Sequence, residues 1–408
     1  MSREEQACQV ILRASCQNAG VSSDPPLYLD HAATTPPLPV ALAAFQQAVE
    51  EAYANPGSLH AAGATAARVV ETSRRQLKRA LGADGYRVIW TATGTESNHL
   101  GIQGLARVLA GPVRRAGATP RILVSAIEHP SALEAARALE AEDFQVDVLP
   151  VNAQGLLAAE TLADAADATV VMAVVHLANN EIGTVQPIAH LVAALRSKAP
   201  NALFHCDAVQ AAGKLPLPLA MTRADSLAIA AHKFGGLRGT AALLLREGAP
   251  EPEPLFRGGG HEGGLRSGTE NTMGIAAMAA AAKWRAEALA QNPQMFNRRR
   301  ATLLQGLREI FPDLVVLGPE AEASCLGAVL SIALPGQRAE PFLHRLEQHG
   351  IYVGSGSACN SHGHTESAVL QAIALPKELG NSVLRVSLSG METDDDLQRT
   401  LQAFQLAL

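Results

Sequence analysis

The sequence of 408 residues is poor in cysteine, aromatic residues and charge, and each shortage excludes a class of protein. It has five cysteines and no CxxC pair, so we expect neither a disulfide framework nor a structural zinc site. No apolar run approaches the length of about 18 residues that a membrane span requires. Charged residues make up 18 % and the net charge is −6, so no positive field favours nucleic acid or an anionic membrane.

The N-terminal end of the chain lacks the hydrophobic core of a secretory signal. It begins with the charged residues Arg3, Glu4 and Glu5, and turn-forming residues at 22–26 close the stretch. We therefore expect residues 1–26 to form an N-terminal extension that is neither a signal peptide nor an anchor. The few scattered cysteines favour a reducing compartment, and a cytoplasmic enzyme is the expectation.

Apolar residues make up 48 % of the chain, which excludes a disordered protein and predicts a large aliphatic core. Short β-branched runs alternate with helical stretches, which predicts a largely parallel sheet buried on both faces. The expected strands are 87–90, 121–127, 146–150, 169–176, 203–206, 226–230 and 240–246. The expected helices among them are 38–53, 59–81, 96–110, 131–141 and 187–199.

The pattern changes after a glycine-rich segment at 257–268. The remaining expected helices are 271–292, 295–310, 338–349, 366–374 and 393–406, with strands near 326–332 and 383–388. From this change we expect a large α/β domain over 41–294 and a small α+β domain over 295–408. The segment 27–40 is expected to pack on the small domain.

Two polar residues at the ends of apolar strands suit a carbonyl cofactor. Lys233 ends the segment SLAIAAHK (226–233), where burial would lower the pKa of its amine and free it to form a Schiff base. Asp207, in LFHCDAVQ (203–210), is placed to pair with the protonated pyridine nitrogen of pyridoxal phosphate (PLP). The plainer interpretations are a surface lysine in a loop and an aspartate that caps a helix.

Two further segments suggest a phosphate site and a mobile thiol. In WTATGTESN (90–98) a strand turns at Gly94 into a helix, whose free N–H groups and Thr95 hydroxyl suit a phosphate. A plain helix cap with Glu96 in the first turn is the alternative. In VGSGSACNS (353–361) Cys359 lies among flexible residues, unlike the apolar surroundings that predict Cys206 and Cys325 to be core residues.

A series of short motifs runs from Tyr28 to Cys359. They are YLDHAATTP (28–36), NPGSLHAAG (55–63), GTESN (94–98), EHPS (128–131), NNEIGTVQP (179–187), HCDAVQ (205–210), AHKFGG (231–236), RSGTEN (266–271) and SGSAC (355–359). In this order they resemble the PLP-dependent cysteine desulfurases of the class V aminotransferase group, in the group I (NifS/IscS-type) form. The resemblance implies fold type I of the PLP-dependent transferases, with a mostly parallel seven-stranded sheet in the large domain and a smaller α+β C-terminal domain.

The resemblance also implies roles for the cofactor-binding residues. Lys233 would hold PLP covalently, Asp207 would pair with its pyridine nitrogen, and Gln210 would contact its phenolic oxygen. His129 would stack on the ring and assist proton transfer, at the rim where open α/β sheets bind ligands. The residues implied to hold the phosphate are Gly94, Thr95 and His232.

Further implied roles concern the substrate and the second subunit. Thr269 would reach the phosphate of the other subunit, which makes the enzyme a homodimer with shared sites. Asn180 and Arg385 would hold the carboxylate of the substrate L-cysteine, Arg385 through a two-pronged pair. Cys359 would become the persulfide and later pass its sulfur to an acceptor.

The sequence departs from this family at three places. Ala230 stands where a phosphate-binding serine is usual, which removes a hydrogen bond to a charged group worth ~1.5–3 kcal/mol. Residues 387–391 read SLSGM where an arginine and an aromatic residue are usual. The chain stops at Leu408, where housekeeping members continue into a tail that contacts an iron–sulfur scaffold, and this leaves room for a dedicated acceptor.

The expected function is therefore a cysteine desulfurase that delivers sulfur to iron–sulfur cluster assembly or to the thiolation of RNA, DNA or a cofactor. A selenocysteine lyase or a cysteine/cystine lyase of the same fold is the alternative, which the retained Cys359 disfavours. A weakly active paralogue acting as a partner protein is a further alternative, against which the intact Lys233, Asp207 and His129 argue. No ligand cluster has the spacing of a zinc or iron–sulfur site.

Overall fold

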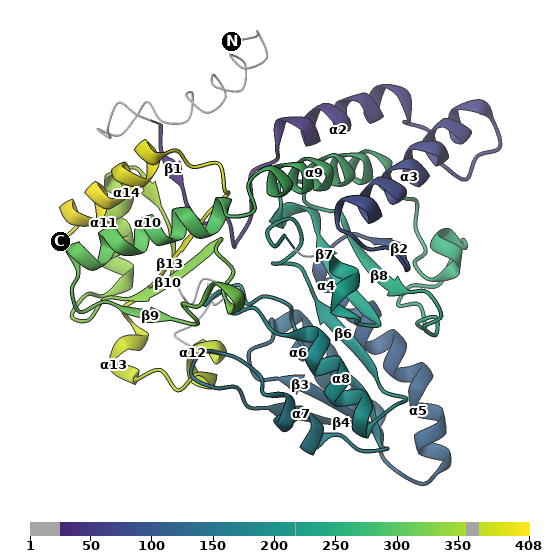
Figure 1. Ribbon diagram of the computed structural model, residues 1–408. Coiled ribbons are helices and arrows are strands. Elements are labelled where there is room, and N and C mark those ends of the chain that lie inside the picture. Colours follow the sequence, from purple (N-terminus) through teal and green to yellow (C-terminus); the bar gives the residue numbers. More distant parts are fainter. Residues whose placement is uncertain (1–24, 217, 356–366) are drawn as a thin grey trace.

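A seven-stranded sheet forms the centre of the computed structural model, which describes residues 25–216, 218–355 and 367–408 (Figure 1). Only β8 runs antiparallel to its neighbours in this sheet. The prediction of a mostly parallel seven-stranded sheet is confirmed. The strand order is β2 (Tyr86–Thr91), β8 (Ala241–Arg246), β7 (Ser226–Ala230), β6 (Leu203–Asp207), β5 (Val170–Val174), β3 (Arg121–Ser125) and β4 (Gln145–Leu149).

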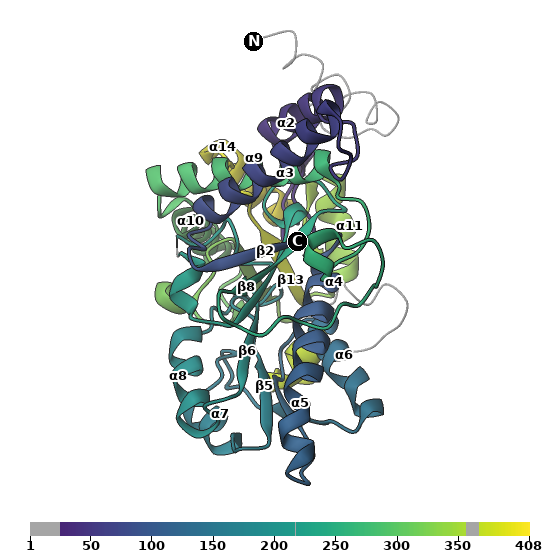
Figure 2. The ribbon, with the colours of Figure 1, turned by 90° about the vertical axis from the view of Figure 1, so that its right-hand side faces the viewer.

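Helices cover both faces of this sheet (Figure 2). One face carries α7 (Ala159–Ala165) and α8 (Ile188–Lys198), and the other carries α4 (Gly94–His99), α5 (Leu105–Arg115) and α6 (Pro130–Arg137). Side chains alternate across β2, so that Val88 and Trp90 join one apolar cluster and Ile89 joins the other. β5, β6 and β7 are buried along their whole length, because both faces of a parallel sheet are covered.

Three long helices pack together beside β2: α2 (Pro39–Glu51), α3 (Ala61–Ala80) and α9 (Thr272–Gln291). α9 presents small side chains, among them Ala277 and Ala281, to its neighbours. At Gly274 an added Cβ would lie 2.2 Å from Oγ1 of Thr240, so only glycine fits there. Small residues thus let α9 lie close to the turn after β7.

A four-stranded sheet of antiparallel pairs organises the C-terminal part of the chain, at the left of Figure 1. Its helices surround a cluster of three phenylalanines, with the rings of Phe311 and Phe404 at a centroid distance of 6.4 Å. The strand order is β12 (Gly354–Ser355), β13 (Val383–Ser387), β10 (Val329–Ala333) and β9 (Val315–Leu317). The helices are α10 (Met295–Ile310), α11 (Ala339–Gln348), α12 (Ala368–Ala372), α13 (Lys377–Gly380) and α14 (Asp394–Leu406).

The N-terminal segment contacts this C-terminal part. β1 (Leu27–Tyr28) pairs in parallel with β11 (Ile351–Tyr352), and the amide of Ser387 donates to the carbonyl of Leu29 at 2.7 Å. The later part of the segment bonds elsewhere, since the amides of Thr35 and Leu38 donate to the carbonyls of His232 and Gly235 after β7. The packing of 27–40 on a small domain and the division at 294 and 295 both stay predictions.

Several short elements escape the sequence pattern, namely α7, α13 and β9. Their spans of three to seven residues are too short to show a period. Cys206 and Cys325 are buried free thiols, as predicted. Over the described ranges, no helix is both long enough and apolar enough to cross a membrane.

Candidate active site

The expected cofactor residues gather at one edge of the central sheet. β2, β3, β5, β6 and β7 all point the same way, so their carboxyl ends meet at this edge. The residues at or just after those ends are Gly94, His129, Asn180, Asp207 and Lys233.

Lys233 follows β7 in a short 3-10 turn, Ala231–Lys233. Its Nζ donates to the carbonyl oxygens of Ala32 at 2.7 Å and Ala33 at 2.8 Å. Nε2 of Gln210 donates to the same Ala32 oxygen at 2.7 Å, and Oε1 of Gln210 accepts from Nζ of Lys214 at 2.8 Å. Lys214 is only 4 % exposed, and burial together with the charge of Lys233 lowers its pKa well below the usual value.

Asp207 is held by a buried network around Asn98. Nδ2 of Asn98 donates to Oδ2 of Asp207 at 2.8 Å and to Oγ of Ser131 at 2.9 Å. The ring of His205 lies 3.1 Å from Oδ1 of Asn98, and the amide of Val209 donates to the other Asp207 oxygen at 2.9 Å. The carboxylate therefore has a fixed orientation at the end of β6.

His129 caps α6 and belongs to the same network through Ser131. Its Nδ1 lies 2.8 Å from Oγ of Ser131 and accepts from the Ser131 amide at 3.1 Å. Burial lowers the pKa of His129, and the positive charge of Lys233 acts in the same direction, whereas Asp207 opposes them. A neutral imidazole at this position is suited to accept a proton.

A second buried acid–base pair lies behind His129. Oε1 of Glu128 accepts from the backbone amide of His176 at 2.8 Å and lies 3.3 Å from its Nδ1. Burial raises the pKa of Glu128 well above its usual value and lowers that of His176 to about 3. Burial therefore disfavours the charged form of each of these two groups.

The turn from β2 into α4, called the phosphate cradle below, is the expected site of the phosphate. Oγ1 of Thr93 accepts from the amide of Glu96 at 3.0 Å, so the plain helix cap is present. The first amide groups of a helix have no partner within it and favour an anion. A Cβ at Gly94 would lie 3.0 Å from Val209 and 3.5 Å from Ala230, so glycine keeps the turn open. Thr95 is exposed beside it.

His232 lies in the turn after β7, and Thr269 lies in the loop before α9. Nδ1 of His232 is 3.1 Å from Oγ1 of Thr34, and burial lowers its pKa to about 4. Thr269 is exposed and lines a cavity of about 100 Å³ together with Ala92 and Arg266. Its expected contact with another subunit stays a prediction.

Arg385 combines burial with a donor that has no partner. Its Nη2 lies 2.6 Å from Oδ1 of Asp30, and its Nη1 donates to the backbone carbonyl of Asn180 at 3.2 Å. Its Nε is buried and has no hydrogen-bond partner among the described residues. Two donor groups of Arg385 are therefore engaged by Asp30 and Asn180, and Nε is the donor left to face a carboxylate.

Cys359 lies outside the described residues, but both described ends of its segment meet the substrate residues. Ser355 precedes the segment on β12, whose neighbour Gly354 pairs with Arg385. Ser367 follows the segment, and its Oγ donates to Oε2 of Glu181 at 2.6 Å. The described residues on either side of 356–366 therefore lie near Arg385 and Glu181, and Glu181 is the neighbour of Asn180 in the sequence.

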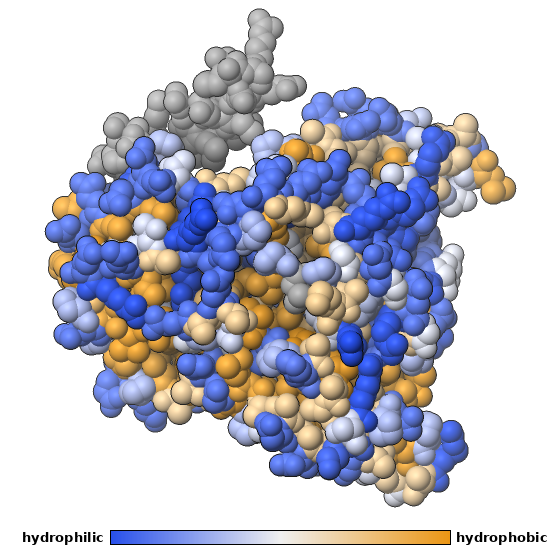
Figure 3. Space-filling model, viewed as in Figure 1, coloured by the Kyte–Doolittle hydropathy of each residue, from blue (hydrophilic) through white to orange (hydrophobic). Residues whose placement is uncertain are grey.

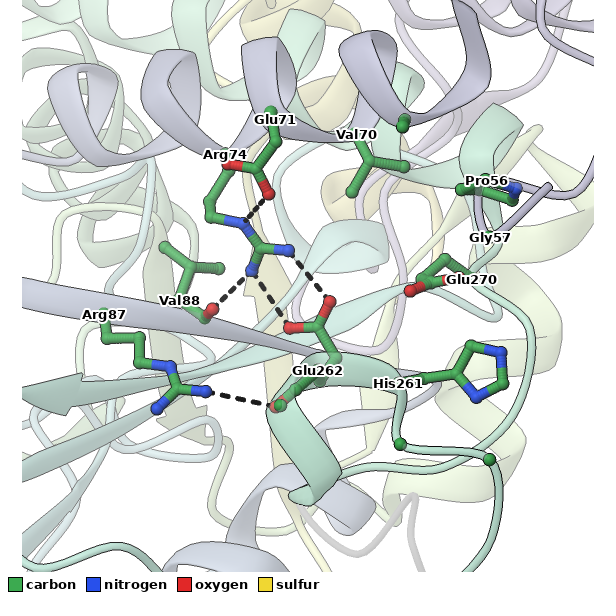
Figure 4. Close-up of a pocket in the computed structure, with 14 residues that line it drawn as sticks. Pro56, Gly57, Val70, Glu71, Arg74, Arg87, Val88, His261, Glu262 and Glu270 are labelled. Carbon is green, nitrogen blue, oxygen red and sulfur yellow. Dashed lines mark hydrogen bonds and ion pairs between the residues drawn. The ribbon is translucent and has the colours of Figure 1, made fainter. Parts of the chain in front are cut away.

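A pocket of about 530 Å³, lined by charged side chains, lies between α3, β2 and the glycine-rich loop (Figure 4). Arg74 of α3 forms a two-pronged pair with Glu262 at 2.8 and 3.0 Å, and Glu262 also accepts from the amide of Trp90 at 3.0 Å. Arg87 donates to the backbone carbonyl of Glu262 at 3.1 Å. Arg74 and Glu262 thus tie the loop before Thr269 to α3 and β2, whereas one carboxylate oxygen of Glu270 in this pocket is buried without a hydrogen-bond partner among the described residues.

Sequence reasoning assigned no role to several polar residues of the site. Asp30 and Asn98 lie inside the motifs YLDHAATTP and GTESN, so the motifs themselves pointed to them. His176 and Lys214 lie outside the cited motifs, and only their burial reveals them.

Comparison with known proteins agrees with this geometry. The model of the aminotransferase class-V family matches residues 27–400. A cysteine desulfurase of Sinorhizobium fredii is 37 % identical over 92 % of this chain and 95 % of its own, and the cysteine desulfurase IscS of a Clostridium botulinum strain is 32 % identical over 92 % of both. A solved NifS-like protein superposes with a TM-score of 0.84 at 29 % identity, covering 93 % of this chain and 98 % of its own. The chain therefore belongs to the class-V aminotransferase family, in its NifS/IscS-type branch.

Proposed function

We propose that this chain is a PLP-dependent cysteine desulfurase that converts L-cysteine to L-alanine and takes up the sulfur on Cys359. The observation that carries the proposal is that Asp207 and Lys233 follow neighbouring strands at one edge of the sheet, while Arg385 contacts Asn180 and pairs with Gly354, shortly before Cys359 in the sequence. The relatives named above are themselves cysteine desulfurases.

The residues present suit PLP. Lys233 would hold it, Asp207 would face its ring nitrogen, and the open turn at Gly94 would receive its phosphate. When bound, PLP supplies an electron sink for negative charge at the substrate Cα. The Asn98 network keeps the Asp207 carboxylate fixed for this pairing, and the lowered pKa of His129 leaves its imidazole able to accept a proton.

The substrate and the nucleophile approach from the C-terminal part. Arg385 would bind the substrate carboxylate through its unpaired Nε, with Asn180 beside it. The Cys359 thiolate attacks the substrate sulfur, so that an S–S bond forms while the C–S bond breaks. The electron pair of the broken bond stays with carbon, and a proton then completes the methyl group of alanine.

The test compares the wild-type protein with Cys359→Ser and, as a control, Cys325→Ser. We expect a visible PLP absorption band in all three proteins. With a thiol reductant present to release the persulfide sulfur as sulfide, production of alanine and sulfide from L-cysteine is expected for wild type and Cys325→Ser only. Release that survives Cys359→Ser would indicate the lyase alternative. A wild-type protein that binds no PLP would overturn the proposal and favour a partner protein.

The proposal includes a homodimer with shared sites. Exposed apolar side chains lie at the tip between α2 and α3, where Tyr53 is 69 % exposed and Leu59 is fully exposed (Figure 3). A surface of this kind favours association with another protein surface. Thr269, exposed near the phosphate cradle, is the residue expected to serve the other subunit.

Subunit mixing tests the shared site. Lys233→Ala and Thr269→Ala each remove one part, so each protein alone is expected to lose activity. A mixed dimer contains one site with both residues intact if the site is shared, and activity then returns on mixing. Absence of recovery, or full activity of Thr269→Ala, would refute the shared site.

The sulfur acceptor and the compartment also belong to this proposal. A persulfide on Cys359 needs a thiol or a cluster-assembly protein to receive its sulfur. Because Cys359 must stay reduced between turnovers, we place the enzyme in a reducing compartment such as the cytoplasm.

A further inference from the structure

Arg285 of α9 is a buried cation that joins two loops of the site. It is only 2 % exposed. Its Nε donates to the carbonyl of Phe234 at 3.0 Å, and its Nη1 donates to the carbonyl of Ser389 at 2.5 Å. Phe234 directly follows Lys233, and Ser389 lies four residues after Arg385. One planar guanidinium therefore spans the turn of the cofactor lysine and the strand end of the substrate arginine.

Burying the charged guanidinium of Arg285 costs desolvation free energy, so hydrogen bonds and a nearby negative charge must offset it. Removing a guanidinium from water costs several kcal/mol unless its donors are satisfied and an anion is near. Burial lowers the pKa of Arg285 to about 10, and the negative charge of Glu392 opposes this shift. Lys214 and His31 are further titratable groups that feel the positive charge of Arg285.

Glu392 orders the loop around Ser389, to which Arg285 donates its hydrogen bond. Its Oε1 accepts from the amide of Ser389 at 2.6 Å and from the Ser389 hydroxyl at 2.7 Å, and its Oε2 accepts from the amide of Gly390 at 3.0 Å. Gly390 has a φ of +83°, and a Cβ there would lie 2.7 Å from Met295. This loop is the SLSGM segment in which the sequence departs from the family.

We propose that Arg285, seated on the loop built by Glu392, is a positioning residue that fixes Lys233 and Arg385 relative to each other. The inference rests on the proposed function, since it assigns the amino-acid substrate to these two residues. An amino acid held at its carboxylate by Arg385 and at its amino end near Lys233 spans the distance that Arg285 sets. Loss of Arg285 should therefore weaken amino-acid binding more than it slows the chemical step.

The test compares wild type with Arg285→Met, Arg285→Lys and Glu392→Gln, all loaded with PLP. The readout is the dissociation constant of the product L-alanine, obtained from the change in the visible PLP spectrum, together with kcat and KM for L-cysteine. For Arg285→Met we expect alanine binding about 10-fold weaker and KM raised alike, with kcat within about twofold, as for a lost charge-assisted bond. Arg285→Lys should recover part of this loss, because an ammonium can replace one of the two bonds.

Arg300→Met is the matched control. Arg300 is another buried arginine, and its Nε donates to the carbonyl of Val329 on β10 at 3.2 Å. Its loss should lower the thermal midpoint without changing alanine affinity. The inference would be overturned if Arg285→Met and Arg300→Met weakened alanine binding equally. It would also be overturned if Arg285→Met, Arg285→Lys and Glu392→Gln all bound alanine as tightly as wild type. If Arg285→Met fails to fold, the alanine dissociation constants of Arg285→Lys and Glu392→Gln test the inference, and both are expected to exceed the wild-type value. A wild type without PLP or turnover would instead refute the proposed function.

Discussion

Some single side chains of the site contact several other site residues at once. Asn98 uses its amide group to bind Asp207, Ser131 and His205, so one residue orients both Asp207 and the serine that contacts His129. Such a network is rigid only when every member is satisfied. Ala230 is a second single residue of interest, because it stands where the family usually has a serine whose hydroxyl binds the phosphate.

Ala230→Ser should strengthen PLP retention. Ala230 is 1 % exposed, and its Cβ lies 3.5 Å from the place of a Cβ on Gly94, so a serine hydroxyl there would face the phosphate cradle. A hydrogen bond to a charged group contributes ~1.5–3 kcal/mol, equivalent to roughly 10- to 100-fold slower loss of PLP. The measurement is the decay of the PLP absorption band during dialysis.

The control for this substitution is Ala242→Ser, which places a hydroxyl at another buried alanine, on strand β8. We expect it to leave PLP loss unchanged. If Ala230→Ser loses PLP as fast as wild type, the missing serine has no bearing on the cofactor.

At the scale of elements, a π-helical turn at Leu100–Gly104 joins α4 to α5 and brings the helix close to β6. An added Cβ on Gly101 would lie 2.5 Å from the ring of His205, which bonds to Asn98. Gly101→Ala should therefore displace that ring, lower the free energy of unfolding by ~1–3 kcal/mol and weaken PLP retention. Urea unfolding and the dialysis measurement check both effects.

Gly111→Ala is the comparison within the same helix. At Gly111 an added Cβ meets only the end of the flexible Arg115 side chain, at 3.2 Å. Alanine favours helix over glycine by ~1 kcal/mol, whereas Pro112 disfavours a helical residue with a Cβ directly before it, so this variant should lose less stability than Gly101→Ala. A loss of stability equal to that of Gly101→Ala would show that the contact with His205 is not the cause.

The elements that the sequence predicted are those with a long or strongly apolar pattern. β5 and β7 are uninterrupted apolar runs, and α10 is long enough for a helical period to show. α7 and β9 are short, and their placement depends on contacts with distant segments. Gly94, His129, Asp207 and Lys233 lie at one edge of the sheet, and the roles expected for them stay predictions. In contrast, Arg285 and Lys214 could not be found from the sequence, because their importance depends on burial between loops far apart in the chain.

At the scale of the whole molecule, buried histidines couple stability to pH. Burial lowers the pKa of His176 and His205 to about 3 and that of His31 and His232 to about 4. The unfolded chain binds protons near pH 6.5, whereas the folded protein does not, so the free energy of unfolding falls as the pH falls below about 6.5. Glu128 acts in the opposite direction, because its pKa is raised in the folded state.

His205→Gln isolates one of these histidines, since His205 is fully buried and no carboxylate contributes to its shift. Between pH 7 and pH 5.5, the wild-type free energy of unfolding should fall. The variant should lose about 1.4 kcal/mol less, because the unfolded chain no longer takes up the proton of His205 over roughly one pH unit below 6.5. Urea unfolding at both values, with PLP saturating, measures the difference. The same substitution at the exposed His344 on α11 should leave the wild-type pH dependence intact. An unchanged pH dependence in His205→Gln would mean that the protonation of His205 is not coupled to folding, and that another group causes the acid sensitivity.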